Sequence, residues 1–319
     1  MALSTQLHVV TGKGGTGKTT VAAALAMALA AKGKKVLLCE VEGRQGIAQL
    51  FDVPPLPYEE RQIAVGLGGG EVYALAIDPE SALLEYLAMY YRLGRAGKAL
   101  ERFGIIDFAT TIAPGVRDVL LTGKVYEAAG RRSGDGLTYD AVIMDAPPTG
   151  RITRFLNVNA EVAGLAKVGP IRRQADSIME MMRSSATHVH LVTVLEEMPV
   201  QETIDGIAEL ESARLPVGHV ILNLVRPSLM SDGTREALQS GSLKPAKVAA
   251  SLARSSVTKA AAPALIAGGE ANLERHRLQD EQREILQDCG RPLIELPSLR
   301  DGIDLGALFE LADQLRDLA

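Results

Sequence analysis

The sequence predicts an α/β fold with a doubly wound, mostly parallel sheet. Short apolar segments rich in β-branched residues alternate with helical patterns, which is typical of successive strand–helix–strand units. These segments are apolar on both faces, as strands covered by helices on each side must be. The predicted strands are Leu7–Thr11, Lys35–Val41, Tyr73–Ile77, Asp140–Asp145, Val189–Val194, His219–Asn223 and Pro292–Leu296.

Two predominantly helical stretches interrupt this alternation. They span residues 79–139 and 151–187, and each follows the end of a predicted strand. Doubly wound sheets bind their ligands at these strand ends. We expect residues 1–319 to form a single domain in which the two stretches make one helical subdomain above the site. Within the first stretch, Arg131–Gly136 is predicted to be a loop that re-enters the core. Residues 228–272 are also predicted to be helical, and the sequence suggests no role for them.

The composition argues against several classes of function. The formal net charge is −5 and there is no long run of Lys or Arg, which disfavours nucleic-acid binding. Cys39 and Cys289 are predicted to be free thiols in a reducing compartment, and without a C-x-x-C pair they cannot form a tetrathiolate zinc site. The longest apolar run, Val21–Ala31, is too short to span a bilayer, and the first residues do not resemble a secretion signal. We therefore expect a cytoplasmic protein without stable membrane insertion.

A phosphate-binding loop is predicted at residues 12–20, Gly-Lys-Gly-Gly-Thr-Gly-Lys-Thr-Thr. It matches G-x-x-x-x-G-K-[ST], follows the first predicted strand and opens a helix predicted at Val21–Lys32. Glycines let the backbone wrap an anion, and the helix N-terminus adds partial positive charge. Lys18 is therefore expected to reach the β- and γ-phosphates of ATP, and Thr19 to place its hydroxyl on Mg²⁺. The other predicted nucleotide-binding residues of the loop are Gly12, Gly14, Gly15, Thr16, Gly17 and Thr20.

Lys13, near the start of the loop, is a second and more specific feature. The pattern G-K-G-G-x-G-K-[ST]-T resembles the deviant phosphate-binding loop of one ATPase class. This class includes the arsenite-pump ATPase, the targeting factor for tail-anchored membrane proteins, partition and septum-site ATPases and the nitrogenase iron protein. In that class the first lysine reaches across a dimer interface to the nucleotide of the partner. The resemblance implies a homodimer, or a heterodimer with a paralogous ATPase, in which Lys13 takes part in catalysis; the alternative is a solvated loop lysine.

The segment 145–156 narrows this resemblance to one family. It follows a predicted strand and is similar to the D-x-A-P-T-G-x-x-x-R-F-L switch of the arsenite-pump and tail-anchored-protein targeting family, above all in its actinobacterial members. An Asp at a strand end beside a phosphate-binding loop can hold the water shell of Mg²⁺, which is the role expected of Asp145. The chain is thereby identified as a member of this family, with ATP and Mg²⁺ as its cofactors.

Stretches near the other end of the chain carry the same resemblance. Asn223 ends a predicted strand that is similar to the one whose terminal Asn meets the adenine edge in this family. Pro297 belongs to a stretch, residues 295–297, that resembles the late loop closing over the base. Residues 191–197, followed by Glu202 and Thr203, resemble the strand and helix of a further family segment. The resemblance implies that Asn223 and Pro297 bind the nucleotide.

One position of the predicted site departs from the family. The first switch of the family is usually D-P-A-H-x-L-S-D, whose last Asp is expected to activate water, and the aligned stretch here is Glu42–Gln49. Gln49 stands at the position of that Asp. An amide cannot accept a proton as a carboxylate does, but it can orient an attacking water, as Gln does in some GTPases. Arg44 and Arg151, the latter in place of a family His, could either stabilise charge or form surface salt bridges.

Two further departures concern metals. Two cysteines cannot build a three-thiolate arsenite site, so arsenite transport is not expected. The cysteines of the zinc clasp found in some targeting factors are also absent, so a dimer is expected to hold without it. His188 and His190 lie on one face of a predicted strand, and no third ligand of matching spacing is visible in the sequence. Ordinary packing is therefore favoured over metal binding for these two residues.

The sequence leaves three functional hypotheses. The leading one is a dimeric conformational switch that hydrolyses MgATP and couples hydrolysis to a protein or membrane-protein client. The second is a weakly hydrolysing regulatory subunit that pairs with a paralogous ATPase, because Gln49 replaces the expected base. The third is membrane-protein targeting, in which an apolar groove of the helical subdomain binds a client; an ordinary helical core explains the same residues. These residues are Leu83, Leu84, Leu87, Tyr91, Ile178, Met181 and Met182.

Overall fold

The computed structural model describes residues 6–91, 115–165, 170–252, 257–300 and 302–318. Its main sheet consists of β1 (Gln6–Gly12), β2 (Val36–Glu40), β3 (Arg61–Val65), β4 (Glu71–Ala76), β7 (Ala141–Asp145), β8 (Thr187–Thr193), β9 (Val217–Val225) and β10 (Leu293–Pro297). The strand order is β10-β9-β8-β1-β7-β2-β4-β3. Every pair is parallel except β3–β4. The predicted fold class and all seven predicted strands are confirmed.

The strand of the main sheet that the sequence did not predict is β3, at its edge. Its side chains are exposed or only half-buried, so the apolar pattern of a central strand is absent. A glycine-rich turn joins it to β4, in which the N–H of Gly66 donates to the carbonyl of Gly70 at 2.8 Å. A Cβ atom on Gly68 would lie 2.0 Å from the carbonyl oxygen of Ala31, so this turn needs glycine to pass the end of α1 (Lys18–Ala31).

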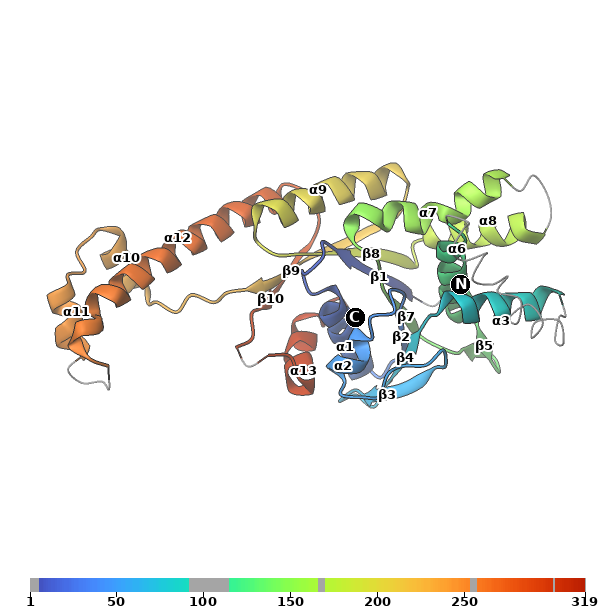
Figure 1. The fold of residues 1–319 in the computed structure, drawn as a ribbon, viewed down its shortest axis with the longest axis horizontal. Coiled ribbons are helices and arrows are strands. Elements are labelled where there is room, and N and C mark those ends of the chain that lie inside the picture. Colours follow the sequence, from blue (N-terminus) through green and yellow to red (C-terminus); the bar gives the residue numbers. More distant parts are fainter. Residues whose placement is uncertain (1–5, 92–114, 166–169, 253–256, 301, 319) are drawn as a thin grey trace.

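Helices cover both faces of the sheet (Figure 1). One face carries α1, α2 (Gly46–Leu50) and α13 (Leu305–Gln314); the other carries α6 (Val116–Gly130), α7 (Thr149–Leu165) and α9 (Glu197–Ser212). Residues 21–30 of α1 are buried on every side. A helix enclosed in this way must be apolar all round, which explains the longest apolar run of the sequence.

The two stretches predicted to be helical contain α3 (Pro79–Tyr91), α6, α7 and α8 (Pro170–Met182), together with a small hairpin of β5 (Arg132–Ser133) and β6 (Gly136–Leu137) where a loop was expected. Ile178 and Met182 are buried in the same core as the sheet, and Leu83 and Met181 pack against it. Leu84 is half-buried, while the side chains of Leu87 and Tyr91 lie outside the described residues. Ile178 and Met182 therefore form ordinary core and are not available to a client.

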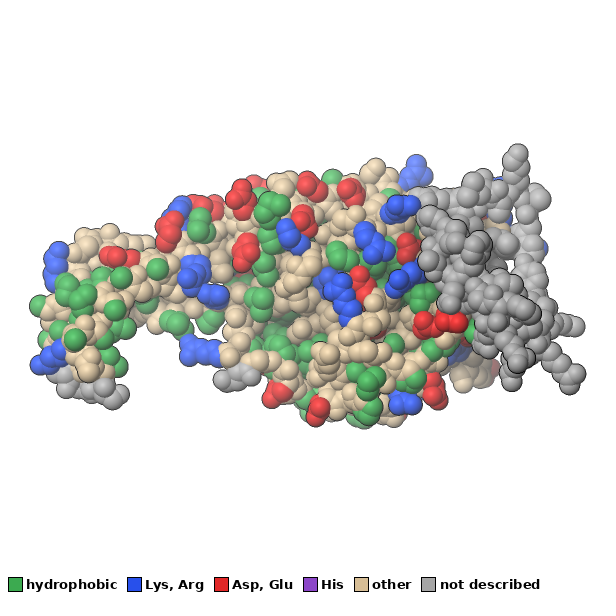
Figure 2. All heavy atoms as spheres, viewed as in Figure 1, with side chains coloured by type: hydrophobic (Ala, Val, Ile, Leu, Met, Phe, Trp, Pro, Cys, Tyr) green, Lys and Arg blue, Asp and Glu red, His purple; other side chains and the backbone are tan. Residues whose placement is uncertain are grey.

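A helical arm projects beyond the β10 edge of the sheet (Figure 1). It consists of α10 (Asp232–Gln239), α11 (Pro245–Leu252), η1 (Lys259–Ala261) and the first part of α12 (Ala262–Gln287). Figure 2 shows apolar side chains gathered on the arm, where a cavity of about 560 Å³ is lined by Leu229, Leu238 and Leu265 among others. None of the described helices is both long and apolar enough to cross a membrane.

Four histidines, His8, His188, His190 and His219, come together where β1, β8 and β9 lie side by side. His8 Nδ1 lies 3.0 Å from His190 Nε2, and the backbone N–H of His219 donates to His190 Nδ1. Burial lowers the pKa of His8 to about 3 and that of His190 well below the ordinary value. Among the described residues, no group of three or more His, Cys, Asp or Glu is arranged to hold a metal ion. His8 and His190 are therefore buried and neutral at neutral pH, while His188 and His219 are half-buried at the rim of the cluster.

Replacing His8 by Leu is expected to flatten the acid side of the stability curve. The unfolded chain takes up a proton near pH 6.5, whereas folded His8 stays neutral down to about pH 3. Above pH 6.5 the His8 side chain is neutral in both states, and the free energy of unfolding is unaffected by its titration. Between pH 6.5 and about pH 3, each unit of falling pH lowers the free energy of unfolding by about 1.4 kcal/mol. Urea titrations from neutral to mildly acidic pH should show a shallower fall in the free energy of unfolding for the variant. His276→Gln, outside the cluster, should keep the wild-type slope; parallel curves for His8→Leu and wild type would contradict the assignment.

Candidate functional site

The predicted phosphate-binding loop joins the end of β1 to the start of α1, in the centre of the sheet. A Cβ atom on Gly12 would lie 2.1 Å from the carbonyl oxygen of Val192, so only glycine lets β1 pass β8 at this point. Gly17 has φ +88°, a left-handed conformation that favours glycine, and it caps α1. The backbone N–H and the hydroxyl of Thr16 both donate to the carbonyl of Lys13. These contacts hold the loop closed on itself.

The N-terminus of α1 is free to bind an anion. Its capping residue, Gly17, supplies no side-chain hydrogen bond, and the first turn contains no acidic residue. The first N–H groups of a helix have no partner within the helix, and the helix dipole makes this end electropositive. Gly14 and Gly15 leave open space where a side chain would lie. The loop therefore has the geometry of a phosphate cradle.

Lys18 opens α1 and is turned into the protein, with 8% of its surface exposed. Burial lowers the pKa of Lys18, while the carboxylates of Asp145 and Glu42 raise it. The ammonium group is thus placed beside the cradle with acidic groups near it. A buried ammonium ion with little water around it interacts strongly with a phosphate that enters the loop.

Thr19 and Asp145 meet at the end of β7, where Asp145 lies opposite Val10 of β1. The Thr19 hydroxyl donates to Asp145 Oδ2 at 2.6 Å. Burial, together with the nearby carboxylates of Glu40 and Glu42, raises the pKa of Asp145 to about 6, against the lowering effect of the Thr19 hydrogen bond and of Lys18. A hydroxyl and a buried carboxylate with other acidic groups nearby are oxygen ligands suited to Mg²⁺. The residues present fit the predicted magnesium site.

The stretch between β2 and α2 is fixed by Glu40, which sequence reasoning missed. Its buried carboxylate accepts the backbone N–H groups of Gln45 and Ile47, at the start of α2. A Cβ atom on Gly46 would lie 3.1 Å from Thr19 Cγ2, so the start of α2 is packed against Thr19, the predicted magnesium ligand. Gln49, one turn later on α2, is exposed to solvent. Among the described residues, no hydrogen bond joins the Gln49 side chain to the loop.

Asn223 supports the loop from the end of β9. Its side chain is 4% exposed, and its Nδ2 donates to the carbonyl of Thr16 at 2.8 Å. A Cβ atom on Gly17 would lie 2.3 Å from the same nitrogen. Pro297 ends β10 and lies opposite Val225, two residues beyond Asn223 on the neighbouring strand. The structure thus brings Asn223 and Pro297 to one end of the sheet, and it adds a loop-supporting contact that the sequence did not predict.

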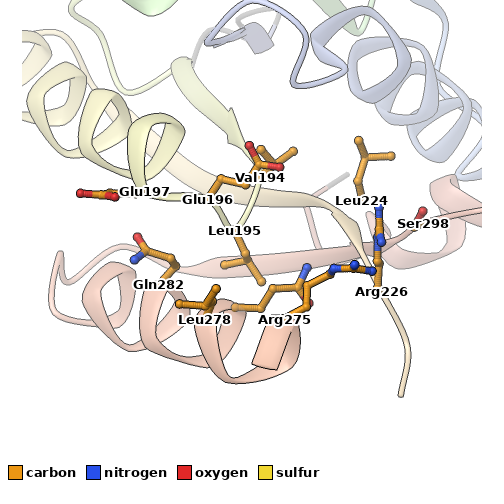
Figure 3. Close-up of a pocket in the computed structure, with 11 residues that line it drawn as sticks. Val194, Leu195, Glu196, Glu197, Leu224, Arg226, Arg275, Leu278, Gln282 and Ser298 are labelled. Atoms are coloured by element: carbon orange, nitrogen blue, oxygen red, sulfur yellow. The ribbon is translucent and has the colours of Figure 1, made fainter. Parts of the chain in front are cut away.

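A cavity of about 580 Å³ lies next to Asn223 (Figure 3). Leu224 and Arg226 of the β9 end and Arg275 and Leu278 of α12 line it, with Leu224 and Leu278 on different sides and the Arg275 side chain directed toward Arg226. The remaining lining residues of this cavity are Val194, Leu195, Glu196, Glu197, Gln279, Gln282 and Ser298. Leu224 has φ +57° and is 45% exposed, an unusual backbone conformation for a branched residue. Such strain tends to gather at functional sites, and this cavity lies at the same end of the parallel strands as the phosphate cradle.

Arg44 and Arg151 are both engaged with acidic residues. Arg44 Nη2 lies 3.6 Å from Glu42 Oε2, and Arg151 Nη2 lies 3.9 Å from Asp118 Oδ1. Their side chains are 73% and 61% exposed. The two arginines also line one cavity of about 210 Å³. This geometry favours the surface salt bridges over the role as charge stabilisers.

Lys13 engages a different carboxylate from Lys18. Its Nζ lies 2.7 Å from Oε1 of Glu202 on α9. Both side chains are partly exposed, whereas Lys18 is buried. The two lysines of one loop are therefore directed to different surroundings, and the contact with Glu202 could not be foreseen from spacing in the sequence.

Comparison with known proteins identifies the family. The model of the anion-transporting ATPase family matches residues 5–186. ATPase BagA of Mycobacterium tuberculosis is 51% identical over 315 residues, which cover 97% of this chain and 92% of that protein. ATPase GET3 of Kluyveromyces lactis is 28% identical over 197 residues, 59% of this chain and 55% of that protein. The arsenical pump-driving ATPase of Acidiphilium multivorum is 26% identical over 240 residues, 68% of this chain and 39% of that protein. The predicted resemblance is confirmed: the chain belongs to the anion-transporting ATPase family and is an ATPase.

Proposed function

We propose that this chain is a dimeric conformational switch driven by MgATP binding and hydrolysis. The observation that carries the proposal is the contact of Thr19 with Asp145, beside buried Lys18 and the free N-terminus of α1. Lys18 and the N–H groups of the loop bind the β- and γ-phosphates. Thr19 and Asp145 would hold Mg²⁺, with the hydroxyl of Thr19 as a ligand and the carboxylate of Asp145 acting on the water shell of the ion. When bound, Mg²⁺ neutralises charge that develops on the phosphate oxygens.

The nucleotide base is proposed to occupy the cavity beside Asn223. Asn223 keeps the loop in place through Thr16, and its remaining carbonyl oxygen can accept a hydrogen bond from a base. Leu224 and Leu278 offer apolar surface for a base on two sides of this cavity. Pro297 ends β10, and the next residue, Ser298, lines the cavity.

Catalysis in this proposal rests on positioning and on stabilising charge. Lys13 of one protomer and Lys18 of the other stabilise the γ-phosphate, and Gln49 orients the attacking water once the dimer closes. Gln49 is exposed in the structure, so its amide is accessible to a water molecule. The start of α2 already lies against Thr19, so a short movement of this helix is coupled to the magnesium site.

Replacing Gln49 by Ala is expected to lower kcat about tenfold and to leave ATP binding unchanged. A side chain that only orients water contributes less than a full proton-transfer group, which supplies about 10² to 10⁴. Gln49→Asp places a carboxylate at the same position and should retain or increase turnover. Gln239→Ala, exposed on α10, is the control. Steady-state turnover and nucleotide titration separate the two effects; loss of ATP binding in Gln49→Ala would contradict this role.

A second candidate is a regulatory subunit that binds ATP and hydrolyses it weakly. The exposed amide of Gln49, at the position of the expected base, is the observation that favours it. Turnover by the purified chain alone should be compared with turnover after a paralogous ATPase is added. Robust hydrolysis by a homodimer supports the leading proposal, whereas hydrolysis that appears only with the paralogue supports the second.

We also propose that hydrolysis is coupled to a protein client and not to arsenite. Cys39 is fully buried, and burial raises its pKa to about 12, so its thiol stays protonated and is a poor metalloid ligand. Cys289 is half-buried on a different part of the chain. Addition of arsenite is therefore expected to leave ATP turnover unchanged.

A further inference from the structure

The ion pair of Lys13 with Glu202 joins two parts of the backbone that are each held firmly. On the loop side, the carbonyl of Lys13 accepts both the N–H and the hydroxyl of Thr16. On the helix side, Thr203 next to Glu202 is 1% exposed, and its hydroxyl donates to the carbonyl of Pro199 at 2.8 Å. The rotamer of the long Lys13 side chain is the main freedom left, and the contact with Glu202 selects it.

The two lysines of the loop differ in their burial and in the carboxylates that lie near them. Lys18 is buried beside Asp145 and Glu42, which raise its pKa against the effect of burial. Lys13 is 31% exposed in its side chain and is held by Glu202, which is 38% exposed. An exposed lysine without a partner would sample many rotamers, and ordering it when a phosphate binds would cost conformational entropy. Glu202 reduces this cost before a second protomer arrives.

We propose that Glu202 is a positioning residue that holds Lys13 ready for the nucleotide of the partner protomer. This inference rests on the proposed function, in which Lys13 acts across the dimer. The ion pair is partly exposed and therefore weak, so it orders the side chain without trapping it. A lysine ammonium group has three N–H donors, and it can donate to a phosphate while it keeps its contact with Glu202. Reactive groups that are placed in advance accelerate the chemical step more than they tighten substrate binding.

The test is a double-mutant cycle on kcat and KM for MgATP. Glu202→Ala is expected to lower kcat about fivefold with KM unchanged, a loss that corresponds to one imperfectly placed group. Glu202→Gln keeps an oxygen acceptor and should retain most of the activity. In the Lys13→Ala background, Glu202→Ala should cause no further loss. Glu209→Ala, exposed further along α9, is the control and should behave as wild type in both backgrounds.

The outcomes separate this inference from the proposed function. Equal losses from Glu202→Ala with and without Lys13 would mean that Glu202 only supports α9, and would overturn the inference. Wild-type kcat in Glu202→Ala, with Lys13→Ala impaired, would overturn the inference and leave the proposed function standing. Wild-type turnover by Lys13→Ala would overturn both. Far-UV circular dichroism of each variant checks that α9 is intact.

Discussion

Replacing Lys18 by Ala is expected to lower kcat for MgATP by about a thousandfold. A preorganised charged donor in a site with little water supplies about 10² to 10³ of the rate, and Lys18 also holds the substrate phosphates. Lys18 is 8% exposed, and its ammonium group interacts electrostatically with the carboxylate of Asp145. Steady-state turnover, together with nucleotide titration, should show that both hydrolysis and binding suffer. Turnover close to wild type would contradict the assignment of the phosphate site.

The same substitution should leave the protein folded. Burial lowers the pKa of Lys18, which means that its charge is not favoured by the folded state without a phosphate. Replacing Lys18 by a neutral side chain removes this cost of burying its charge. The thermal midpoint of Lys18→Ala without nucleotide is therefore expected to equal or exceed that of wild type. Lys259→Ala, exposed next to α12, is the matched control for both turnover and stability.

Lys13→Ala is expected to have the second largest effect and a different signature. Its side chain is directed to Glu202 and away from the buried surroundings of Lys18, so removing it should leave ATP binding to a single chain nearly unchanged. Turnover should fall about a hundredfold, because a charge that stabilises the γ-phosphate in the transition state is lost. Equilibrium ATP titration and single-turnover kinetics distinguish this pattern from that of Lys18→Ala. Equal weakening of ATP binding in the two variants would contradict a role for Lys13 across the dimer.

The central strands could be predicted because a strand that is buried on both faces needs a short run of mostly apolar residues. β1, β2 and β7 are buried almost throughout and mostly apolar, and their predicted bounds lie within a residue of the observed ones. β3 escaped prediction because it is an exposed antiparallel edge strand, and such strands do not need an apolar pattern. The hairpin of β5 and β6 has strands of only two residues each, which is too short for any periodicity to appear.

The site could be predicted where one segment of chain makes it. The loop at residues 12–20 carries its geometry in consecutive residues, and the carboxylate of Asp145 follows from its place at the end of a strand next to β1. Contacts between distant segments left no such record. Glu202 meets Lys13 and Asn223 meets Thr16 only because α9 and β9 are folded against the loop. The exposed position of Gln49 likewise depends on how α2 is anchored by Glu40.

The most direct test of the central claim is to mix the Lys13→Ala and Lys18→Ala chains and measure MgATP turnover. If Lys13 acts on the nucleotide of the partner, each mixed dimer contains one site with both lysines intact and one with neither. Random exchange of protomers should then restore about a quarter of the wild-type turnover, although each variant alone is nearly inactive. Turnover that stays at the average of the two separate variants would show that Lys13 acts within its own chain, and would contradict the account.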